Sequence, residues 1–415
     1  MFDVVVVGGG IIGASAARHL AQSGASVAVI APPEPTTPET HTGPFGAFHD
    51  VSRLSRRLYA GTVENELSRR ALAANPTIES FSDTQVFSGP AHLFVSRPED
   101  DEGLAEAVAA LPSGHGVNVL NAKELAQRWP EISLPSDVVG FLEPGTGGAL
   151  DPRALVAAQL KGAIASGGKI FTQPAVGLNL DRKNLQTTVT LADASTVAAR
   201  KALVATGAWS NLSGLLPRPV ALRRKTEMVL LAELDPAEAQ RLANLPVMHY
   251  VIDHPAASDI YTVAPITYPD GRTMLKWGTN TTADRWVDTS EDINAWYRSG
   301  DSDRMVDALR SSIEATYPGI SATAWHTQRC VITYTTHAMP YIDILVPDLL
   351  YSAIGGNGRC AKWADPMGAL AASLTLNGKW VDDLPAERFA VDYTQSPAVW
   401  EGRDLLSDRK NNLSG

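Results

Sequence analysis

The apolar pattern at the N-terminus predicts a strand, a turn and a helix. Residues 4–7 are four consecutive valines, and such a continuous β-branched run is typical of a strand buried on both faces. Behind the glycine-rich segment 8–13, apolar residues recur at helical spacing, and Gly24 is placed to end the helix. Residues 26–30 then predict a second strand. This order indicates an α/β unit at the start of the chain.

The rest of the chain alternates between helical and extended patterns, and no internal repeat is visible. Helices are predicted over 63–74, 104–111, 122–129, 151–166 and 296–317. Strands are predicted over 86–95, 201–204 and several parts of 220–284. Residues 31–48 include five prolines and predict an irregular loop, and the polar tail after residue 397 is expected to be loose.

Composition limits the class of protein. The chain has 415 residues, of which 44% are hydrophobic and 19% charged, which is typical of a globular protein with an ample core. A net charge of −10 and the lack of a Lys/Arg run argue against nucleic acid or an anionic membrane as partner. We see neither a membrane-length apolar stretch nor a signal peptide. The only cysteines are Cys330 and Cys360, so we expect a cytoplasmic protein in a reducing compartment.

The segment 8–13 reads Gly-Gly-Gly-Ile-Ile-Gly and satisfies the G-x-G-x-x-G pattern of dinucleotide sites. Gly8 permits the tight turn, Gly10 lets a pyrophosphate approach the backbone, and Gly13 lets the helix pack on the sheet. The helix N-terminus then faces the phosphate charge. An acid about 20 residues later normally binds the ribose. Glu34 lies 21 residues after Gly13 and can reach this position, although two prolines precede it.

Five further segments follow in a fixed order. They are 49–59 (HDVSRLSRRLY), 205–210 (ATGAWS), 274–278 (MLKWG), 329–343 (beginning RCVITYT and ending PYID) and 355–363 (GGNGRCAKW). Together with the glycine-rich segment, they resemble the motifs of flavin-dependent amine oxidases of the D-amino-acid-oxidase superfamily. Within it the chain is most similar to the monomeric sarcosine oxidase group, whose relatives oxidise N-methyltryptophan, pipecolate, fructosyl amino acids and piperideine-carboxylate.

The resemblance implies an FAD cofactor. In the family, a cysteine at the position of Cys330 carries an 8α-thioether to the flavin, and a thiolate can add to the electrophilic 8-methyl position of an oxidised flavin. A free cysteine is otherwise usually a small buried hydrophobic residue, which is our interpretation of Cys360. The residues predicted to contact FAD are Gly8, Gly10, Ile12, Gly13, Glu34, His49, Ser52, Arg53, Val176, Gly207, Trp209, Cys330, Gly356, Asn357, Gly358 and Lys362.

The resemblance also implies four catalytic residues. Arg56 and Lys362 would bind a substrate carboxylate, to which a bidentate guanidinium is well suited. Arg53 would lie beside the flavin. Lys276 would help to reduce oxygen, because a fixed ammonium stabilises superoxide. Two alternatives stay open, namely that Arg56 belongs to a solvated basic segment and that Lys276 only reaches solvent.

Three substrate-binding residues are predicted in addition to Arg56 and Lys362: Tyr261, Asn280 and Trp363. Asn280 stands where the family has a histidine, and Tyr261 is one place away from the family's active-site tyrosine. The loop between Pro265 and Lys276 is also longer than in the family. We therefore expect a substrate that is larger than sarcosine or cyclic.

The predicted fold class is α/β (α+β overall), with a Rossmann-like FAD-binding domain interleaved with an antiparallel-sheet substrate domain. The FAD-binding domain is expected to comprise 1–80, 146–215 and 326–390. The substrate domain would comprise 81–145 and 216–325, followed by a tail over 391–415.

The function predicted from these motifs is oxidation of a secondary or cyclic amino or imino acid. Hydride from the C–N bond would pass to flavin N5 and electrons to O2, giving H2O2 and an imine. The alternatives are a dehydrogenase that reduces a quinone or a partner protein, a flavin monooxygenase, whose late G-D motif we do not find, and a non-catalytic binding module. We expect a monomer. We also expect no metal site, because H-E-x-x-H does not occur and the two cysteines are thirty residues apart, and we interpret His249 and His254 as surface or core residues rather than ligands.

Overall fold

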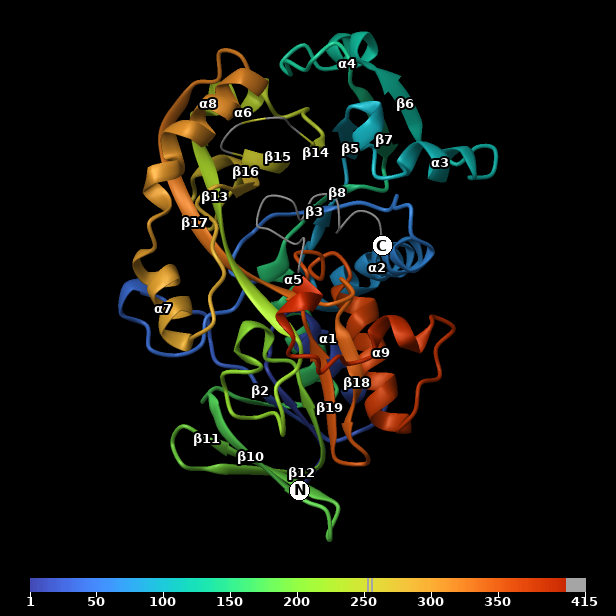
Figure 1. The fold of residues 1–415 in the computed structure, drawn as a ribbon, viewed down its shortest axis with the longest axis vertical. Coiled ribbons are helices and arrows are strands. Elements are labelled where there is room, and N and C mark those ends of the chain that lie inside the picture. The colour runs from blue at the N-terminus through green and yellow to red at the C-terminus, as the bar shows by residue number, and fades with distance from the viewer. Residues whose placement is uncertain (252–253, 255–256, 401–415) are drawn as a thin grey trace.

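The computed structural model describes residues 1–251, 254 and 257–400, and it contains two large sheets, one above the other in Figure 1. In the lower sheet, β1 (Phe2–Val7) pairs in parallel with β2 (Val27–Ile30) and β12 (Thr196–Val204). The four valines of β1 are buried, as predicted for a strand covered on both faces. The remaining strands of this sheet are β9 (Lys169–Phe171), β10 (Ala175–Asp181), β11 (Gln186–Leu191), β18 (Tyr341–Val346) and β19 (Leu350–Ile354).

Helices pack against the lower sheet. They are α1 (Ile11–Gln22), α2 (Thr62–Ser82), α5 (Pro152–Ala165) and α9 (Ala364–Asn377). Helix α1 contacts both α5 and α9. The contact with α9 is close because Gly368 has no side chain: a Cβ there would lie 2.3 Å from the Cβ of Ser15. This arrangement holds the N-terminus of α1 in a fixed place against the sheet.

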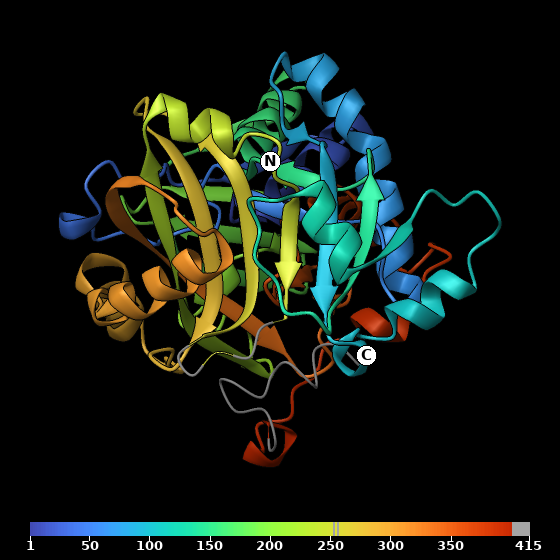
Figure 2. The same ribbon diagram turned by 90° about the horizontal axis from the view of Figure 1, so that it is seen from above.

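The upper sheet is antiparallel except for one parallel pair, β14 with β5. Its strands, in spatial order, are β17 (Ala322–Thr335), β13 (Leu222–Leu234), β16 (Thr273–Thr281), β15 (Ala257–Thr267), β14 (Val247–Tyr250), β5 (Ala91–Ser96), β7 (Val139–Pro144) and β6 (Asn118–Asn121). Seen from above, the yellow strand β14 lies beside the cyan strand β5 (Figure 2). The predicted fold class, a Rossmann-like unit with an antiparallel-sheet part, is confirmed, whereas the exact domain ranges stay a prediction.

The remaining helices are shorter than the sequence pattern suggests. The single helix predicted over 296–317 is wrong, because the chain forms α7 (Ser290–Ser299) and α8 (Val306–Thr316) with a 3-10 turn between them. The break is at Gly300, where a Cβ would lie 2.2 Å from the Trp296 ring. The other short helices are α3 (Leu104–Ala109), α4 (Ala122–Arg128) and α6 (Pro236–Arg241).

A three-stranded sheet lies between the two large ones. It consists of β3 (Arg53–Ser55), β8 (Gly148–Leu150) and β4 (Phe87–Ser88). Strand β3 carries Arg53 and leads into Arg56. Within the part of the chain that the structure describes, no helix is both long and apolar enough to cross a membrane.

A buried histidine and a buried glutamate join the upper sheet to the segment after β3. His92 on β5 lies 2.9 Å from Glu143 on β7, and the other carboxylate oxygen of Glu143 accepts hydrogen bonds from the backbone N–H groups of Arg57 (3.0 Å) and Leu58 (2.7 Å). Burial lowers the pKa of His92 to about 4, although Glu143 opposes this shift. His92 is therefore a neutral donor that orients the Glu143 carboxylate.

We expect this pair to weaken as the pH falls. Between a pKa near 6.5 in the unfolded chain and about 4 in the folded one, the unfolded state binds more protons, so the free energy of unfolding decreases with decreasing pH. His92→Gln keeps a donor and removes the titration. From about pH 7 to about pH 5 the native chain should lose about 2 kcal/mol more than this variant. Denaturant unfolding at both pH values measures the difference, and parallel pH dependences would contradict the assignment.

Candidate active site

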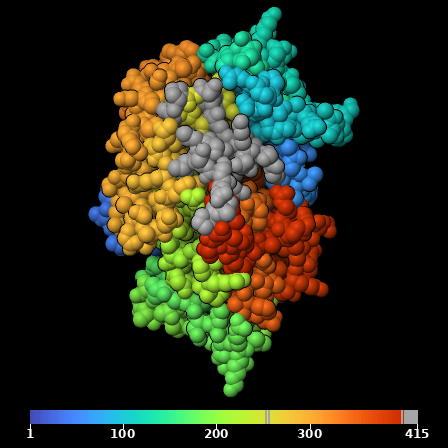
Figure 3. All heavy atoms as spheres, in the orientation of Figure 1, coloured from blue at the N-terminus to red at the C-terminus, as the bar shows by residue number. Residues whose placement is uncertain are grey.

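A cavity of about 990 Å³ lies where the two large sheets meet. Loops that follow β1, β12 and β19 line it from the lower sheet, and residues of β13, β15, β16 and β17 line it from the upper sheet. In the space-filling view, the yellow, orange and cyan segments form the upper half of the molecule and the green and red segments form the lower half (Figure 3). The cavity therefore collects side chains that are far apart in the sequence.

The turn from β1 into α1 fits a dinucleotide. Gly8 has φ +111°, and a Cβ there would lie 2.4 Å from the carbonyl oxygen of Ala205. A Cβ at Gly13 would lie 1.9 Å from the carbonyl oxygen of Gly8, so this glycine permits the contact of helix and turn. Gly8, Gly10 and Ile12 line the cavity at the positive end of the α1 dipole. A pyrophosphate can thus approach the backbone without meeting side chains.

The end of the cavity expected to accept adenosine is lined by Val176 and by the prolines after β2. Val176 is 57% exposed, which is unusual for a valine of a strand. Glu34 does not line the cavity. Its carboxylate pairs with Arg153, whose Nε lies 2.9 Å from Oε2. This contact holds Glu34 against the N-terminus of α5.

The opposite end contains the predicted flavin-attachment residue. Cys330 on β17 lines the cavity, and its Sγ lies 3.9 Å from the carbonyl oxygen of Ala47. Burial raises the pKa of this thiol, and the nearby Arg53 opposes the shift. Arg53 and His49 also line the cavity, and burial lowers the pKa of His49 to about 4, so this imidazole is neutral. A buried thiol beside a guanidinium becomes a thiolate more easily than a buried thiol alone.

The loop after β19 is hydrogen-bonded to the end of β17. Asn357 donates its backbone N–H to the carbonyl of Thr333 (2.7 Å), and its side-chain oxygen accepts from the backbone of Thr335 (2.9 Å). Gly356 and Gly358 line the cavity on either side. On the facing side, Gly207 and Trp209 line the cavity, and the Trp209 indole donates to the carbonyl of Phe45 (3.0 Å).

The two cations predicted to bind a carboxylate converge on one tyrosine. Lys362 donates to the Tyr59 hydroxyl (2.8 Å), and the Arg56 guanidinium carbon lies 4.2 Å from the centre of the Tyr59 ring. Both cations line the cavity. Burial alone would raise the pKa of Tyr59, but Lys362 and Arg56 lower it below its ordinary value. Burial also lowers the pKa of Lys362.

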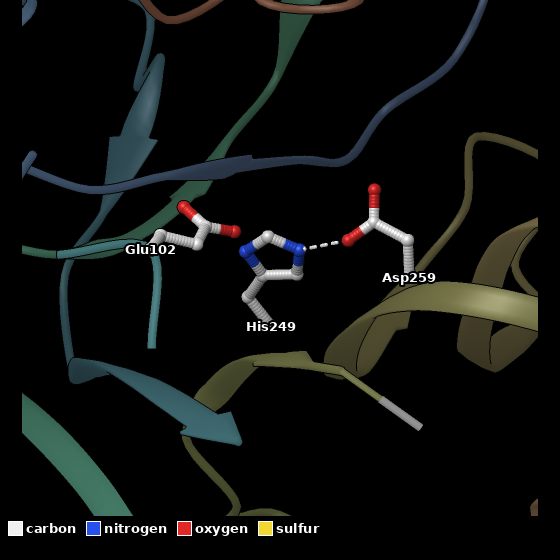
Figure 4. Close-up of side chains that lie close together, drawn as sticks. All are labelled: Glu102, His249 and Asp259. Atoms are coloured by element: carbon white, nitrogen blue, oxygen red, sulfur yellow. Dashed lines mark hydrogen bonds and ion pairs between the residues drawn. The ribbon is translucent and has the colours of Figure 1, made fainter. Parts of the chain in front are cut away.

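Arg56 also contacts a cluster that the sequence did not reveal. Its guanidinium lies 2.9 Å from Oε2 of Glu102 and 3.5 Å from Nδ1 of His249, and His249 in turn contacts Asp259 (Figure 4). Burial alone would lower the pKa of Arg56, but Glu102 raises it. His249, which the sequence suggested to be a surface or core residue, is half-buried and lines the cavity.

One cluster of side chains that could hold a metal ion is found among the described residues. It consists of Glu102, His249 and Asp259, whose possible ligand atoms all lie within 4.8 Å of one another. The Arg56 guanidinium contacts Glu102 and His249 at once, so a permanent positive charge already lies beside these ligand atoms. That charge repels a metal cation. The cluster is better described as an ion-pair network around Arg56.

Lys276 lies behind the cavity wall. It is 1% exposed, contacts the carboxylate of Asp50, and donates to the carbonyl of Ser52 (2.5 Å). Burial and the charge of Arg53 lower the pKa of Lys276 well below the ordinary value, whereas Cys330 and Glu227 act in the opposite direction. Neither Lys276 nor Ser52 lines the cavity.

Two of the three remaining substrate-site predictions face the cavity. Tyr261 on β15 and Asn280 on β16 line it, and the Tyr261 hydroxyl donates to Glu227 (3.0 Å). Trp363 does not line it, which corrects that assignment. Its indole is buried among core residues and donates to Ser68 (2.8 Å), where it supports the Tyr59 ring at a centroid distance of 5.5 Å.

Five residues of the site were not predicted: Tyr59, Glu102, Glu227, His249 and Asp259. Tyr59 ends the motif 49–59, so its place in that pattern was an available signal. The other residues lie in segments of ordinary strand or loop composition. Only the pairing of β14 with β5 and β15, and of β13 with β17, brings them to the cavity.

Comparison with known proteins identifies the family. The model of the family described as FAD dependent oxidoreductase (DAO) matches residues 3–374. The chain is 26% identical over 391 residues to monomeric sarcosine oxidase of Bacillus sp. (strain B-0618), covering 92% of this chain and 94% of the relative. It is also 26% identical over 231 residues to N-methyl-L-tryptophan oxidase of Citrobacter koseri, covering 54% of this chain and 58% of the relative.

A solved structure shares the fold. NikD, described as an unusual amino acid oxidase essential for nikkomycin biosynthesis, superposes with a TM-score of 0.74 at 20% identity, covering 95% of this chain and 98% of NikD. The family match spans the glycine cradle, the cavity loops and the β17 cysteine, which confirms the predicted resemblance and FAD as the cofactor. This chain belongs to the DAO family of FAD-dependent oxidoreductases.

Proposed function

We propose that the protein oxidises the C–N bond of a secondary or cyclic amino acid with O2 as electron acceptor. The observation that carries the proposal is the convergence of Arg56 and Lys362 on Tyr59, in the cavity that also contains the glycine cradle and Cys330. Bound FAD would supply the acceptor for a hydride. The named relatives, a sarcosine oxidase and an N-methyl-L-tryptophan oxidase, act on amines of this class, which supports the same conclusion.

Lys362 is the better placed of the two carboxylate ligands. Its ammonium contacts Tyr59, and among the described residues no carboxylate is paired with it. Arg56 is already paired with Glu102, so a substrate carboxylate shares or replaces that contact. Anchoring the carboxylate here would fix the position of the substrate's C–N bond relative to the cofactor. The reactive amine must be neutral, because a protonated nitrogen has no lone pair to expel hydride.

The cavity supports a substrate larger than sarcosine. The cavity also has to hold the cofactor, but it extends past Arg56 to His249 and Asp259, which gives polar partners beyond the carboxylate site. Tyr261 and Asn280 lie along the same wall. A cyclic or extended amino acid can reach these groups, whereas the small sarcosine molecule would leave them with their partners inside the protein.

Covalent attachment of FAD through Cys330 is part of the proposal. The thiol lines the cavity beside Arg53, and its strand faces the loops that hold the rest of the site. Cys360 also borders the cavity, but it is buried, and burial raises the pKa of its thiol to about 12. A thiol that resists ionisation is a poor nucleophile, which favours Cys330 over Cys360.

The attachment site can be tested by mass. We expect the denatured native protein to retain one FAD on the peptide that contains Cys330. The Cys330→Ser variant should release all its FAD on denaturation, since a hydroxyl is a far weaker nucleophile than a thiolate. Cys360→Ser is the matched control and should retain the covalent flavin. FAD released from the native protein would refute attachment.

If Lys362 and Arg56 bind the substrate carboxylate, substituting Lys362 should weaken the site for carboxylates and substituting Glu102 should strengthen it. Lys362→Met should lower kcat/KM for an amino acid by about 10- to 100-fold, because it removes one charge-assisted hydrogen bond. Glu102→Gln should instead tighten the binding of a simple carboxylate inhibitor such as benzoate, because Arg56 loses its internal partner. The exposed Lys379→Met serves as control. If Glu102→Gln weakened benzoate binding, Glu102 could not be competing with a bound carboxylate for Arg56.

A dehydrogenase is the second candidate, and the position of Lys276 favours it. This lysine is sealed behind the cavity wall by Asp50 and Ser52, so it has no direct path to oxygen in the cavity. Its charge can still act on the cavity, because the Lys276 ammonium lies 5.4 Å from the centre of the Tyr261 ring, which lines the cavity.

Reduction and reoxidation separate the candidate activities. For an oxidase, anaerobic addition of sarcosine, L-proline or L-pipecolate should bleach the flavin without NADPH, and air should restore the colour with release of H2O2. Slow recovery in air with fast recovery by a quinone would instead support the dehydrogenase. A strict requirement for NADPH would point to a monooxygenase, and no bleaching with any of the three amines would contradict the proposed substrate class.

A further inference from the structure

A buried glutamate lies at the centre of the cavity wall. Glu227 is 7% exposed, lines the cavity, and stands directly opposite Cys330 in the pairing of β13 with β17. Its Oε1 accepts the hydroxyl of Tyr261 at 3.0 Å. Nothing in the carboxylate site or in the cofactor cradle uses this side chain.

The contact between Tyr261 and Glu227 depends on a glycine. Tyr261 belongs to β15 and Glu227 to β13, and β16 lies between these strands. The Tyr261 ring crosses β16 at Gly278, where a Cβ would lie 2.0 Å from a ring carbon. Any side chain at Gly278 would therefore separate the hydroxyl from the carboxylate. The absence of a side chain at Gly278 thus allows the Tyr261 hydroxyl to donate a hydrogen bond to the buried Glu227 carboxylate.

Glu227 has one cation in direct contact, Lys225, and one hydroxyl donor, Tyr261. Lys225 lies 3.4 Å away, but it also pairs with Asp284 at 3.0 Å. Tyr261 comes from β15, and the further charged or titratable groups that face Glu227 are Arg53 on β3, Lys276 on β16 and Cys330 on β17. Burial raises the pKa of Glu227, and Lys225 opposes this shift. A carboxylate of this kind accepts a proton more readily than one in water.

We propose that Glu227 is the proton acceptor for the substrate's ammonium group, which it reaches through the hydroxyl of Tyr261. The inference rests on the proposed function, since that reaction needs a neutral amine. One N–H bond of the ammonium breaks as its proton passes to the Tyr261 oxygen, and the Tyr261 proton passes to Oε1 of Glu227. The ammonium and the carboxylate become an amine and a carboxylic acid, so no electron is transferred and the total charge is unchanged.

This transfer has a physical reason in the cavity. Most aliphatic amines are protonated at neutral pH, and burying their charge is costly unless it is paired or neutralised. Passing the proton to Glu227 removes two opposite charges from a region of low dielectric at once. It also provides the amine's lone pair at the place where the reaction needs it. Tyr261 touches the substrate side, and Glu227 stores the proton.

The test is the pH dependence of kcat/KM for the fastest of sarcosine, L-proline and L-pipecolate. In the native holoenzyme, activity should persist well below the pKa of the amine. In Glu227→Gln the reaction should depend on neutral amine from solution, so kcat/KM should fall about tenfold per pH unit below that pKa and approach the native value above it. Tyr261→Phe should show the same slope. Glu233→Gln, at the far end of β13, is the matched control.

A second measurement separates proton transfer from a structural effect. Pyrrole-2-carboxylate has a carboxylate but no basic nitrogen, so its binding, followed by the flavin absorption spectrum, should be unchanged in Glu227→Gln at each pH. An equal loss of kcat/KM at all pH values, or weaker binding of this probe, would overturn the proposal. If Glu227→Gln does not fold, Tyr261→Phe decides the question alone. Failure of the native enzyme to oxidise any of the three amines would instead contradict the proposed function.

Discussion

Buried charges along the segment 49–59 connect the two sheets, and the site depends on their pairing. Asp50 contacts Lys276 of the upper sheet, and Arg56 pairs with Glu102. The backbone after Arg56 donates to Glu143. A buried charge without a partner is strongly destabilising, so each pair limits where this segment can lie. The segment in turn places Tyr59 against Lys362 from the lower sheet.

This arrangement gives the cavity two chemically different walls. Near Tyr59, Lys362 provides a positive charge that no described carboxylate neutralises, and this wall suits an anion. Near Tyr261, Glu227 provides a buried carboxylate that is paired with Lys225 on one side and suits a cation on the other. An α-amino acid carries one group of each sign on the same carbon atom. The cavity therefore matches the charge pattern of a zwitterion with the cofactor cradle beside it.

The local motifs were sufficient to predict the cofactor and many of the residues that line the cavity. The glycine segment 8–13 has a conformational requirement that few other residues satisfy, so Gly8 and Gly13 could be assigned from spacing alone. Three further predicted residues line the cavity: Arg56, Lys362 and Cys330. Each lies in a short motif whose backbone path is determined locally. Trp363 failed for the opposite reason. Trp363 directly follows Lys362 at the start of α9, and side chains of adjacent residues there point in different directions. The Trp363 indole therefore packs in the core while Lys362 faces the cavity.

The sequence by itself determined the α/β start, the dinucleotide turn and the residue types of the carboxylate site, because these depend on backbone conformation and on contacts between near neighbours. Only the tertiary structure decided that Glu102 pairs with Arg56, that His249 reaches the cavity and that Glu227 meets Tyr261. Those contacts join residues from different strands and loops and depend on strand order, and the contact of Tyr261 with Glu227 also depends on the glycine at position 278. No periodicity along the chain records which strands become neighbours, since that choice is made by packing the whole sheet.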